Sequence, residues 1–203
     1  MLNAETPRLK FALYGAHSSL GSAVLCELLS RQHEAVALIN DFNSLTARPG
    51  LRTKAGNLFD AASVSRSVAG MHGVICLFDS PSVPTAPDAR LVGQPQDLYQ
   101  AVYTLLQGMT DAGVNRLLLV ADFAAHAGES ELDAARSMIA SHPLKWTLVD
   151  ADTVGEDLSI DDFSDIAGLP SNDLRVRLRR VAAALADELE RPQHVHQQIQ
   201  FSF

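Results

Sequence analysis

The stretch from Lys10 to Asp41 limits the possible folds of this chain more than any other. Apolar runs and small residues divide it into a strand, a turn, a helix and a second strand, at Phe11–Tyr14, Gly15–Gly21, a helix ending at Leu29, and Ala35–Ile39. A strand, a crossover helix and a second strand form a βαβ unit, in which the two strands lie parallel. The sequence therefore predicts an α/β fold built on a parallel sheet.

The turn of this unit has the residue types of a phosphate-binding loop. Gly15 allows a tight turn after the strand, and Gly21 lets the helix lie close to the sheet. The first N–H groups of a helix, together with its dipole, favour a pyrophosphate. Ser18 stands where the common fingerprint has its middle glycine, and its hydroxyl could bind phosphate or cap the helix. A βαβ unit that binds nothing is the alternative.

Asp41 lies twenty residues after Gly21, counted as 41 minus 21. An acid at about this distance bonds the adenosine ribose in dinucleotide-binding folds. The turn and Asp41 together predict a nucleotide site.

Length and charge narrow the class of protein. A chain of 203 residues is large enough for one domain with its own core. The formal net charge of -8 argues against nucleic acid and anionic membranes as partners. Cys26 and Cys76 fall inside predicted elements, which is typical of buried thiols in a reducing compartment. No apolar run is long enough for a membrane span, and residues 1–10 lack a signal-peptide pattern, so we expect a cytoplasmic protein.

The remaining elements follow from apolar patterns and turn residues. We expect strands at 51–55, 73–78, 116–121 and 145–149, helices at 61–69, 96–111, 130–140 and 182–189, and an edge strand in the tail at 195–203. Ile199, Phe201 and Phe203 of the tail should face the core. Residues Leu174–Leu178 alternate like a strand but also continue into the last helix, so both assignments stay open.

Two predicted loops lie on the ligand side of the sheet, at 79–95 and 151–173. The first is rich in proline and has no periodicity. The second belongs to a span from Trp146 to Leu174 that carries eight acids and neither lysine nor arginine. This span is either a solvated surface loop or an acidic lid that repels acidic substrates.

Four segments resemble motifs of the atypical short-chain dehydrogenase/reductase group, the NmrA-like or NAD-dependent-epimerase-like proteins. The matching segments are Gly15–Gly21 (GATGxxG), Gly56–Asp60 (GDLxD), Ala112–Asp122 (aGVkRfvyvSS) and Trp146–Asp152 (wTilRPg). The resemblance covers nearly the full length. It implies one domain over residues 1–203, with a Rossmann-like, doubly wound, mostly parallel sheet and helices on both faces.

The resemblance also implies a dinucleotide cofactor and the residues that hold it. They are Gly15, His17, Ser18, Ser19, Leu20 and Gly21 for the pyrophosphate, Asp41 for the ribose, and Asn57 and Leu58 for the adenine. Asn40 replaces the basic residue that often holds the 2′-phosphate of NADP, and acidic Asp41 follows it. We therefore expect NAD to be preferred over NADP.

Several departures from the family pattern fall on catalytic positions. Ala121-Asp122 replaces the serine pair, Asp150-Ala151 replaces Arg-Pro, and no Tyr-x-x-x-Lys exists. The usual proton-donating phenol cannot be assigned.

Aspartates at strand ends are the remaining catalytic candidates. Asp79, Asp122, Asp150 and Asp152 follow three strands whose carboxyl ends should meet in one crevice, with His17 and His126 on nearby loops. Crowded carboxylates could act as general acid or base, or hold a divalent cation, whereas single strand-end aspartates commonly cap turns. The cap is the more common role, and no metal-binding pattern of Cys and His is present.

Two functions are compatible with this sequence. The first is an NAD(P)-dependent oxidoreductase or epimerase acting on a small uncharged or cationic substrate. The second is a non-catalytic protein that senses a dinucleotide or serves as an interaction module. The lost catalytic residues favour the second, and the glycine turn with Asp41 favours binding of a nucleotide.

Overall fold

The computed structural model describes residues 8–39, 45–78, 98–123, 130–151 and 158–201. The strands are β1 Lys10–Tyr14, β2 Glu34–Ile39, β3 Leu51–Ala55, β4 Gly73–Leu77, β5 Arg116–Ala121, β6 Lys145–Ala151 and β7 Gln197–Phe201. The helices are α1 Ser19–Ser30, α2 Ala61–Val68, α3 Leu98–Asp111, α4 Ser130–Ala140 and α5 Leu174–Glu190, with a short 3-10 helix, η2 Ile160–Phe163.

The seven strands form one sheet in the order β3-β2-β1-β4-β5-β6-β7. Every neighbouring pair is parallel. The strand order reverses between β1 and β4, and ligands of such folds bind at the carboxyl ends of the strands beside this switch point. The expected doubly wound α/β fold is confirmed, and the described sheet is parallel throughout.

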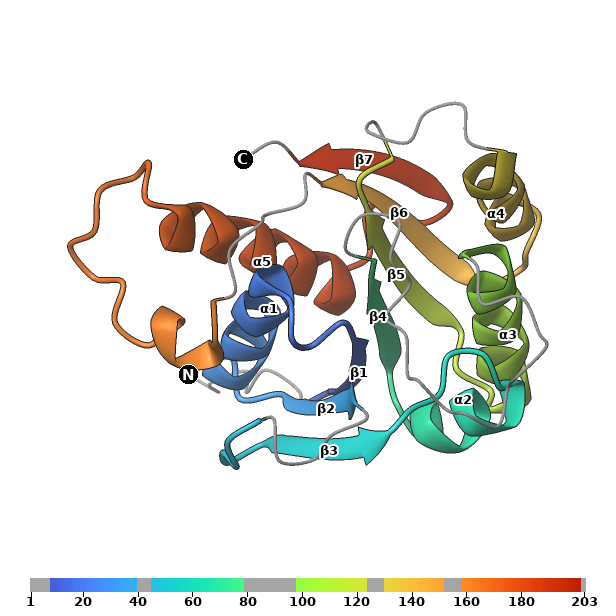
Figure 1. Cartoon of the computed structure of the whole chain (residues 1–203), viewed down its shortest axis with the longest axis horizontal. Helices are drawn as coiled ribbons and strands as arrows, with labels where there is room; N and C mark the ends of the chain where they lie inside the picture. The colour runs from blue at the N-terminus through green and yellow to red at the C-terminus, as the bar shows by residue number, and fades with distance from the viewer. Residues whose placement is uncertain (1–7, 40–44, 79–97, 124–129, 152–157, 202–203) are drawn as a thin grey trace, which may run out of the picture.

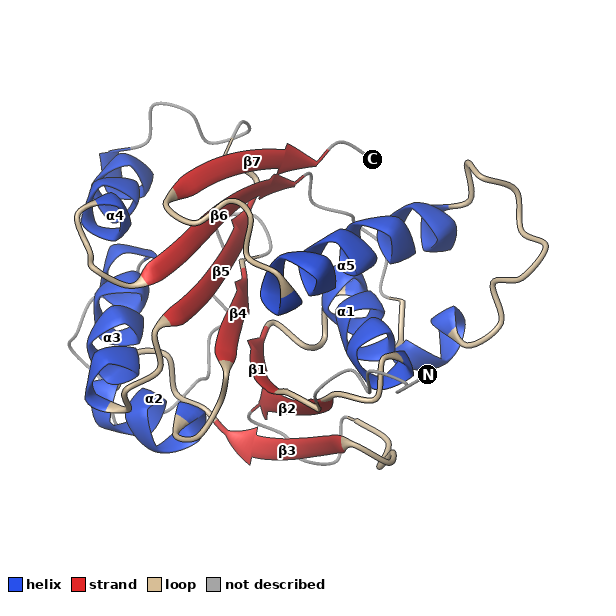
Figure 2. Ribbon diagram, turned by 180° about the vertical axis from the view of Figure 1, so that it is seen from behind, coloured by secondary structure: helices blue, strands red, loops and turns tan. Residues whose placement is uncertain are grey.

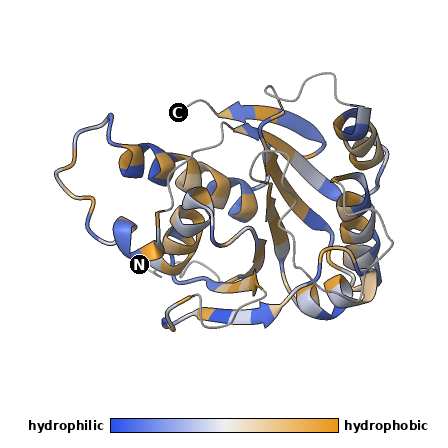
Figure 3. Ribbon diagram, in the orientation of Figure 1, coloured by the Kyte–Doolittle hydropathy of each residue, from blue (hydrophilic) through white to orange (hydrophobic). Residues whose placement is uncertain are grey.

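Helices cover both faces of the sheet (Figures 1 and 2). Helices α1 and α5, with η2, pack on one face, and α2, α3 and α4 pack on the other. Successive residues of β1 alternate between two cores: Phe11 and Leu13 face α1 and α5, whereas Ala12 and Tyr14 face the opposite layer. Because both faces are buried, the central strands are continuous apolar runs, coloured orange in Figure 3.

The sequence left the start of α5 open, and the structure assigns it to the helix. Asp173 caps α5 by accepting a hydrogen bond from the Arg175 N–H at 2.9 Å. The buried stripe of α5 begins at Leu178, and the partly buried Arg175 and Arg177 of its first turns hid the helical period. The predicted helix 182–189 was therefore too short at its amino end.

The tail is an edge strand, as expected, but it is only partly covered. Ile199 and Phe201 are half-buried against the α1 and α5 layer. Phe203 lies outside the described residues, as does the loop 79–95.

The described part of the acidic segment packs beside α1. Phe163 of η2 is buried in the α1 and α5 core. Asp161 forms an ion pair with Arg48, and the Asp162 carboxylate accepts from the N–H and the hydroxyl of Ser159. Asp161 and Asp162 thus have structural partners. This favours the interpretation of the segment as a surface loop over that of an acidic lid.

Candidate functional site

The turn between β1 and α1 can be built only with glycine at two positions. Gly15 has a φ of +84°, and a Cβ there would lie 2.6 Å from the carbonyl oxygen of Leu77. A Cβ on Gly21 would lie 2.1 Å from the carbonyl oxygen of Gly15. The first turn of α1 therefore packs directly on the loop that leaves β1, beside the end of β4.

Ser18 holds this turn closed as the N-cap of α1. Its hydroxyl donates to the Gly15 carbonyl and accepts from the Gly21 N–H, each at 3.0 Å. Its φ of -69° and ψ of 157° are those of a cap residue. Of the two roles open to Ser18, the structure shows the cap.

The neighbouring residues present the start of α1 at the carboxyl end of the sheet. His17 is exposed and Leu20 is half-buried. The first N–H groups of an α-helix have no partners within the helix, and the helix dipole adds positive potential there. Ser19 is buried, and its hydroxyl accepts from the Leu158 N–H at 2.9 Å, which joins the segment after β6 to α1. Sequence reasoning missed this contact, because no local pattern links two residues so far apart.

Asn57 and Leu58 form the turn after β3. The side-chain oxygen of Asn57 accepts from the Phe59 N–H at 2.9 Å, and its backbone N–H donates to the Ser63 hydroxyl at 3.1 Å. Leu58 is buried, and its carbonyl accepts from the hydroxyl of Thr104. Asn57 therefore shapes its own loop, and its amide oxygen can still accept a second hydrogen bond.

Tyr14 joins the glycine turn to the loop before Asn57. It directly precedes Gly15, and a Cβ on Gly56 would lie 3.1 Å from its ring and 2.8 Å from the Cβ of Leu38. Burial, with a smaller effect of Cys76, raises the pKa of the Tyr14 phenol. The buried ring of Tyr14 therefore packs between the glycine turn and the loop before Asn57. Its packing role was missed from the sequence.

Asp150 has a structural partner at the end of β6. It is buried, and its carboxylate accepts from the Phe123 N–H at 2.8 Å. It lies level with Ala121 of β5 and next to the half-buried Asp122. This is the capping role that strand-end aspartates commonly have.

The other residues expected at this crevice are Asp79, His126 and Asp152, and they lie outside the described residues. Asp41, expected at the ribose, also lies outside them. In the part of the chain that the structure describes, no group of three or more His, Cys, Asp or Glu is arranged to hold a metal ion. None of the described helices is long and apolar enough to cross a membrane.

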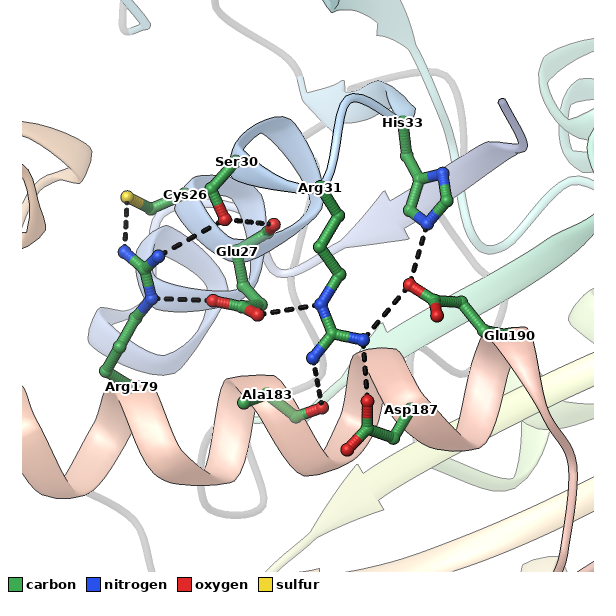
Figure 4. A network of polar contacts seen from close by, with 9 residues as sticks. All are labelled: Cys26, Glu27, Ser30, Arg31, His33, Arg179, Ala183, Asp187 and Glu190. Carbon is green, nitrogen blue, oxygen red and sulfur yellow. Dashed lines mark hydrogen bonds and ion pairs between the residues drawn. The ribbon is translucent and has the colours of Figure 1, made fainter. Parts of the chain in front are cut away.

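The other end of α1 is fixed by charged groups (Figure 4). The Arg31 guanidinium contacts Glu27 at 2.7 Å on its own helix, and Asp187 at 2.6 Å and Glu190 at 3.0 Å on α5. Arg179 of α5 reaches back to Glu27 at 2.7 Å. These pairs hold α1 against α5, and thereby fix where the amino end of α1 lies.

Comparison with known proteins identifies the family of this chain. A family model described as NAD(P)H-binding matches residues 15–192. No curated protein matches the chain by sequence.

Solved structures share its fold. A protein of Bacteroides thetaiotaomicron, provisionally assigned as an epimerase, is 21% identical, with 96% of each chain covered and a TM-score of 0.68. A short-chain dehydrogenase/reductase of Veillonella parvula in complex with NADP is 8% identical, covering 97% of this chain and 95% of that one, with a TM-score of 0.67. The enzyme WbmH of Bordetella bronchiseptica in complex with NAD+ is 13% identical, covering 97% and 76%, with a TM-score of 0.66.

The glycine turn begins where the family match begins, at residue 15, and the match continues through most of the sheet. This chain belongs to the NAD(P)H-binding family.

Proposed function

We propose that this chain binds NAD(H) with the pyrophosphate on the Gly15–Gly21 turn. The observation that carries the proposal is the missing Cβ at Gly15 and Gly21, which lets the start of α1 close onto β1 and β4. A helix start in this position offers N–H groups and positive potential to a phosphate. His17, Ser19 and Leu20 would flank the phosphates, and Ser18 would shape the turn.

The adenosine half of the cofactor would lie toward β2 and β3. Asp41 follows β2 in the sequence and would accept from the ribose hydroxyls. Asn57 and Leu58, packed through Gly56 onto Tyr14, would border the adenine. Bound NAD would supply hydride transfer, and the chain's own residues would orient it.

We further propose a preference for NAD over NADP. An uncompensated acid at Asp41 should disfavour the 2′-phosphate by on the order of 1–3 kcal/mol. NADH should therefore bind more tightly than NADPH, and Asp41→Asn should narrow the difference. Equal or tighter binding of NADPH to the unaltered protein at moderate salt would contradict the preference.

The activity would be that of an atypical short-chain dehydrogenase-like protein. Such a protein would act as an oxidoreductase or epimerase on a small uncharged or cationic molecule. Among the described residues, Asp122 and Asp150 are the candidates for a general acid or base. A second candidate function is dinucleotide sensing without catalysis. The hydrogen bond from the Phe123 N–H to Asp150 favours the second, because it gives this carboxylate a structural role.

The experiment is a titration with NADH, followed by energy transfer from the single tryptophan, Trp146. Gly15 should not be substituted, because a Cβ there overlaps backbone atoms. His17→Asp is a better variant, since His17 is exposed and an acid near a helix start does not destabilise the helix. A carboxylate beside the phosphates should weaken NADH binding by about tenfold or more.

The matched control is His17→Asn, which removes the imidazole without adding charge. It should change the NADH affinity much less than His17→Asp. If both variants bind NADH like the unaltered protein, the pyrophosphate does not lie at this turn.

A further inference from the structure

A buried hydroxyl at the end of β1 lacks a hydrogen-bond partner. Tyr14 is 2% exposed, and among the described residues nothing bonds to its hydroxyl. Two other buried atoms share this state, the Nε atoms of Arg48 and Arg116, but both guanidinium groups bond through their other nitrogens. Buried polar groups nearly always have partners, because burying one without a hydrogen bond costs free energy. The Tyr14 hydroxyl therefore needs an acceptor from outside the described groups.

The ring of Tyr14 places this hydroxyl beside the loop that would border the adenine. Tyr14 is the last residue of β1, level with Leu38 of β2 and Cys76 of β4. A Cβ on Gly56 would lie 3.1 Å from the Cε1 atom of the Tyr14 ring. Because Cε1 neighbours the ring carbon that carries the hydroxyl, this end of the ring lies against the loop that leads to Asn57.

The hydroxyl can act as a hydrogen-bond donor at any physiological pH. Burial, and to a smaller extent Cys76, raises the pKa of the Tyr14 phenol, so the hydroxyl keeps its proton. The loop after β3 uses its own groups for its own structure: the Asn57 oxygen accepts from the Phe59 N–H, and the Leu58 carbonyl accepts from a threonine hydroxyl. Tyr14 thus offers a proton that neither contact uses.

We propose that the Tyr14 hydroxyl donates a hydrogen bond to a ring nitrogen of the cofactor's adenine. This inference rests on the proposed function and adds a residue that recognises the base. Adenine carries ring nitrogens that accept hydrogen bonds and an amine that donates them. The Asn57 oxygen can accept from the amine, and Tyr14 supplies the donor for a ring nitrogen. The base reaches the hydroxyl when the loop moves off the ring edge at Gly56, which has no side chain to repack.

The variant Tyr14→Phe tests this contact, because it keeps the ring and removes only the hydroxyl. In the NADH titration it should weaken binding by about threefold to tenfold, the effect of one lost hydrogen bond. Without NADH, its midpoint of urea unfolding should equal or exceed that of the unaltered protein, because a buried hydroxyl without a partner is gone. A clearly lower midpoint would show that the hydroxyl is already bonded in the free protein, and would overturn the proposal.

Altered cofactors separate a direct contact from an effect on packing. The probes are three NADH analogues in which one adenine nitrogen, N1, N3 or N7, is replaced by C–H. One of the three should bind equally well to Tyr14→Phe and to the unaltered protein, because it lacks the acceptor that the hydroxyl contacts. The other two should lose as much affinity as NADH does. Equal losses with all three analogues would overturn the proposal, because the hydroxyl would then act without touching the base.

The matched control is Tyr103→Phe, which removes a hydroxyl from a tyrosine that is 48% exposed on α3. It should change neither the NADH affinity nor the urea midpoint. If His17→Asp weakens NADH binding while Tyr14→Phe binds NADH like the unaltered protein, the adenine contact is wrong and the phosphate site stands. If the unaltered protein binds no NADH, the proposed function fails, and this inference fails with it.

Discussion

At the amino end of the sheet, charged side chains pair with one another, whereas at the carboxyl end, the candidate site consists of backbone groups and small side chains. Arg116 at the start of β5 is buried and contacts the Glu188 carboxylate at 2.9 Å. His33 is buried, with its ring 2.8 Å from Glu190. At the other end, the Ser18 hydroxyl links the Gly15 carbonyl to the Gly21 N–H.

The comparison shows how one helix can serve two purposes. The carboxyl end of α1 is fixed by ion pairs to α5, and its amino end adjoins the proposed phosphate site. Acids in the last turn of a helix oppose its dipole, yet α5 ends with Asp187, Glu188 and Glu190, each beside a cation or histidine. Because ion pairs at the amino end of the sheet stabilise the fold, residues at the carboxyl end can serve ligand binding.

The largest expected effect comes from breaking the buried pair at the amino end. Glu188→Ala leaves the Arg116 guanidinium buried without its carboxylate and should lower the free energy of unfolding by about 3–5 kcal/mol. Urea unfolding measures this change. Asp133→Asn, in an exposed ion pair, should cost no more than about 1 kcal/mol. Equal losses for the two variants would show that the amino end is not the stabilising region.

A smaller effect is expected at the carboxyl end. Asp150→Ala removes the acceptor of the buried Phe123 N–H and should lower the free energy of unfolding by about 1–3 kcal/mol. The NADH affinity should change little, because this carboxylate shapes the loop after β5. A large loss of NADH affinity with unchanged stability would instead place Asp150 in contact with the cofactor.

Ser18 allows stability and binding to be separated at a single residue. Ser18→Ala removes the cap and should cost about 0.5–2 kcal/mol in unfolding experiments. Ser18→Asp keeps a good cap but adds negative charge, so it should retain stability and weaken NADH binding by about tenfold. Unimpaired NADH binding by Ser18→Asp would place the phosphates away from this turn.

The smallest expected effect is a pH dependence of stability from Glu188. Burial opposes its ionisation, but hydrogen bonds from His194 and Gln193 and the charge of Arg116 outweigh burial and hold the pKa of Glu188 below its ordinary 4.5. A carboxyl group whose pKa is lower in the folded protein stabilises the folded state. This contribution is complete above the ordinary pKa of 4.5 and is lost as the pH falls through the folded-state pKa.

The contribution of Glu188 to the unfolding free energy should therefore be constant well above its ordinary pKa and decline as the pH falls below it. Glu188→Gln should make that decline shallower. An identical acid limb in the variant would mean that other carboxylates dominate it.

The sequence predicted most of the fold because its central strands are continuous apolar runs between clear turn signals. Gly15 and Gly21 were identifiable because their spacing reflects a local backbone requirement. The start of α5 was not, because its first turns carry alternating arginines. The contacts Ser19–Leu158 and Arg116–Glu188 join residues distant in sequence, and no local period encodes them.

Hydrogen–deuterium exchange with and without saturating NADH tests the central claim most directly. We expect NADH to slow exchange at the amides of residues 15–22, at the start of α1, and to leave the amides of 187–197 at the amino end of the sheet unchanged. Protection at 187–197 without protection at 15–22 would contradict the claim. It would move the dinucleotide to a groove of about 390 Å³ between α5 and β7, which Ala184, Glu188 and Ile199 line.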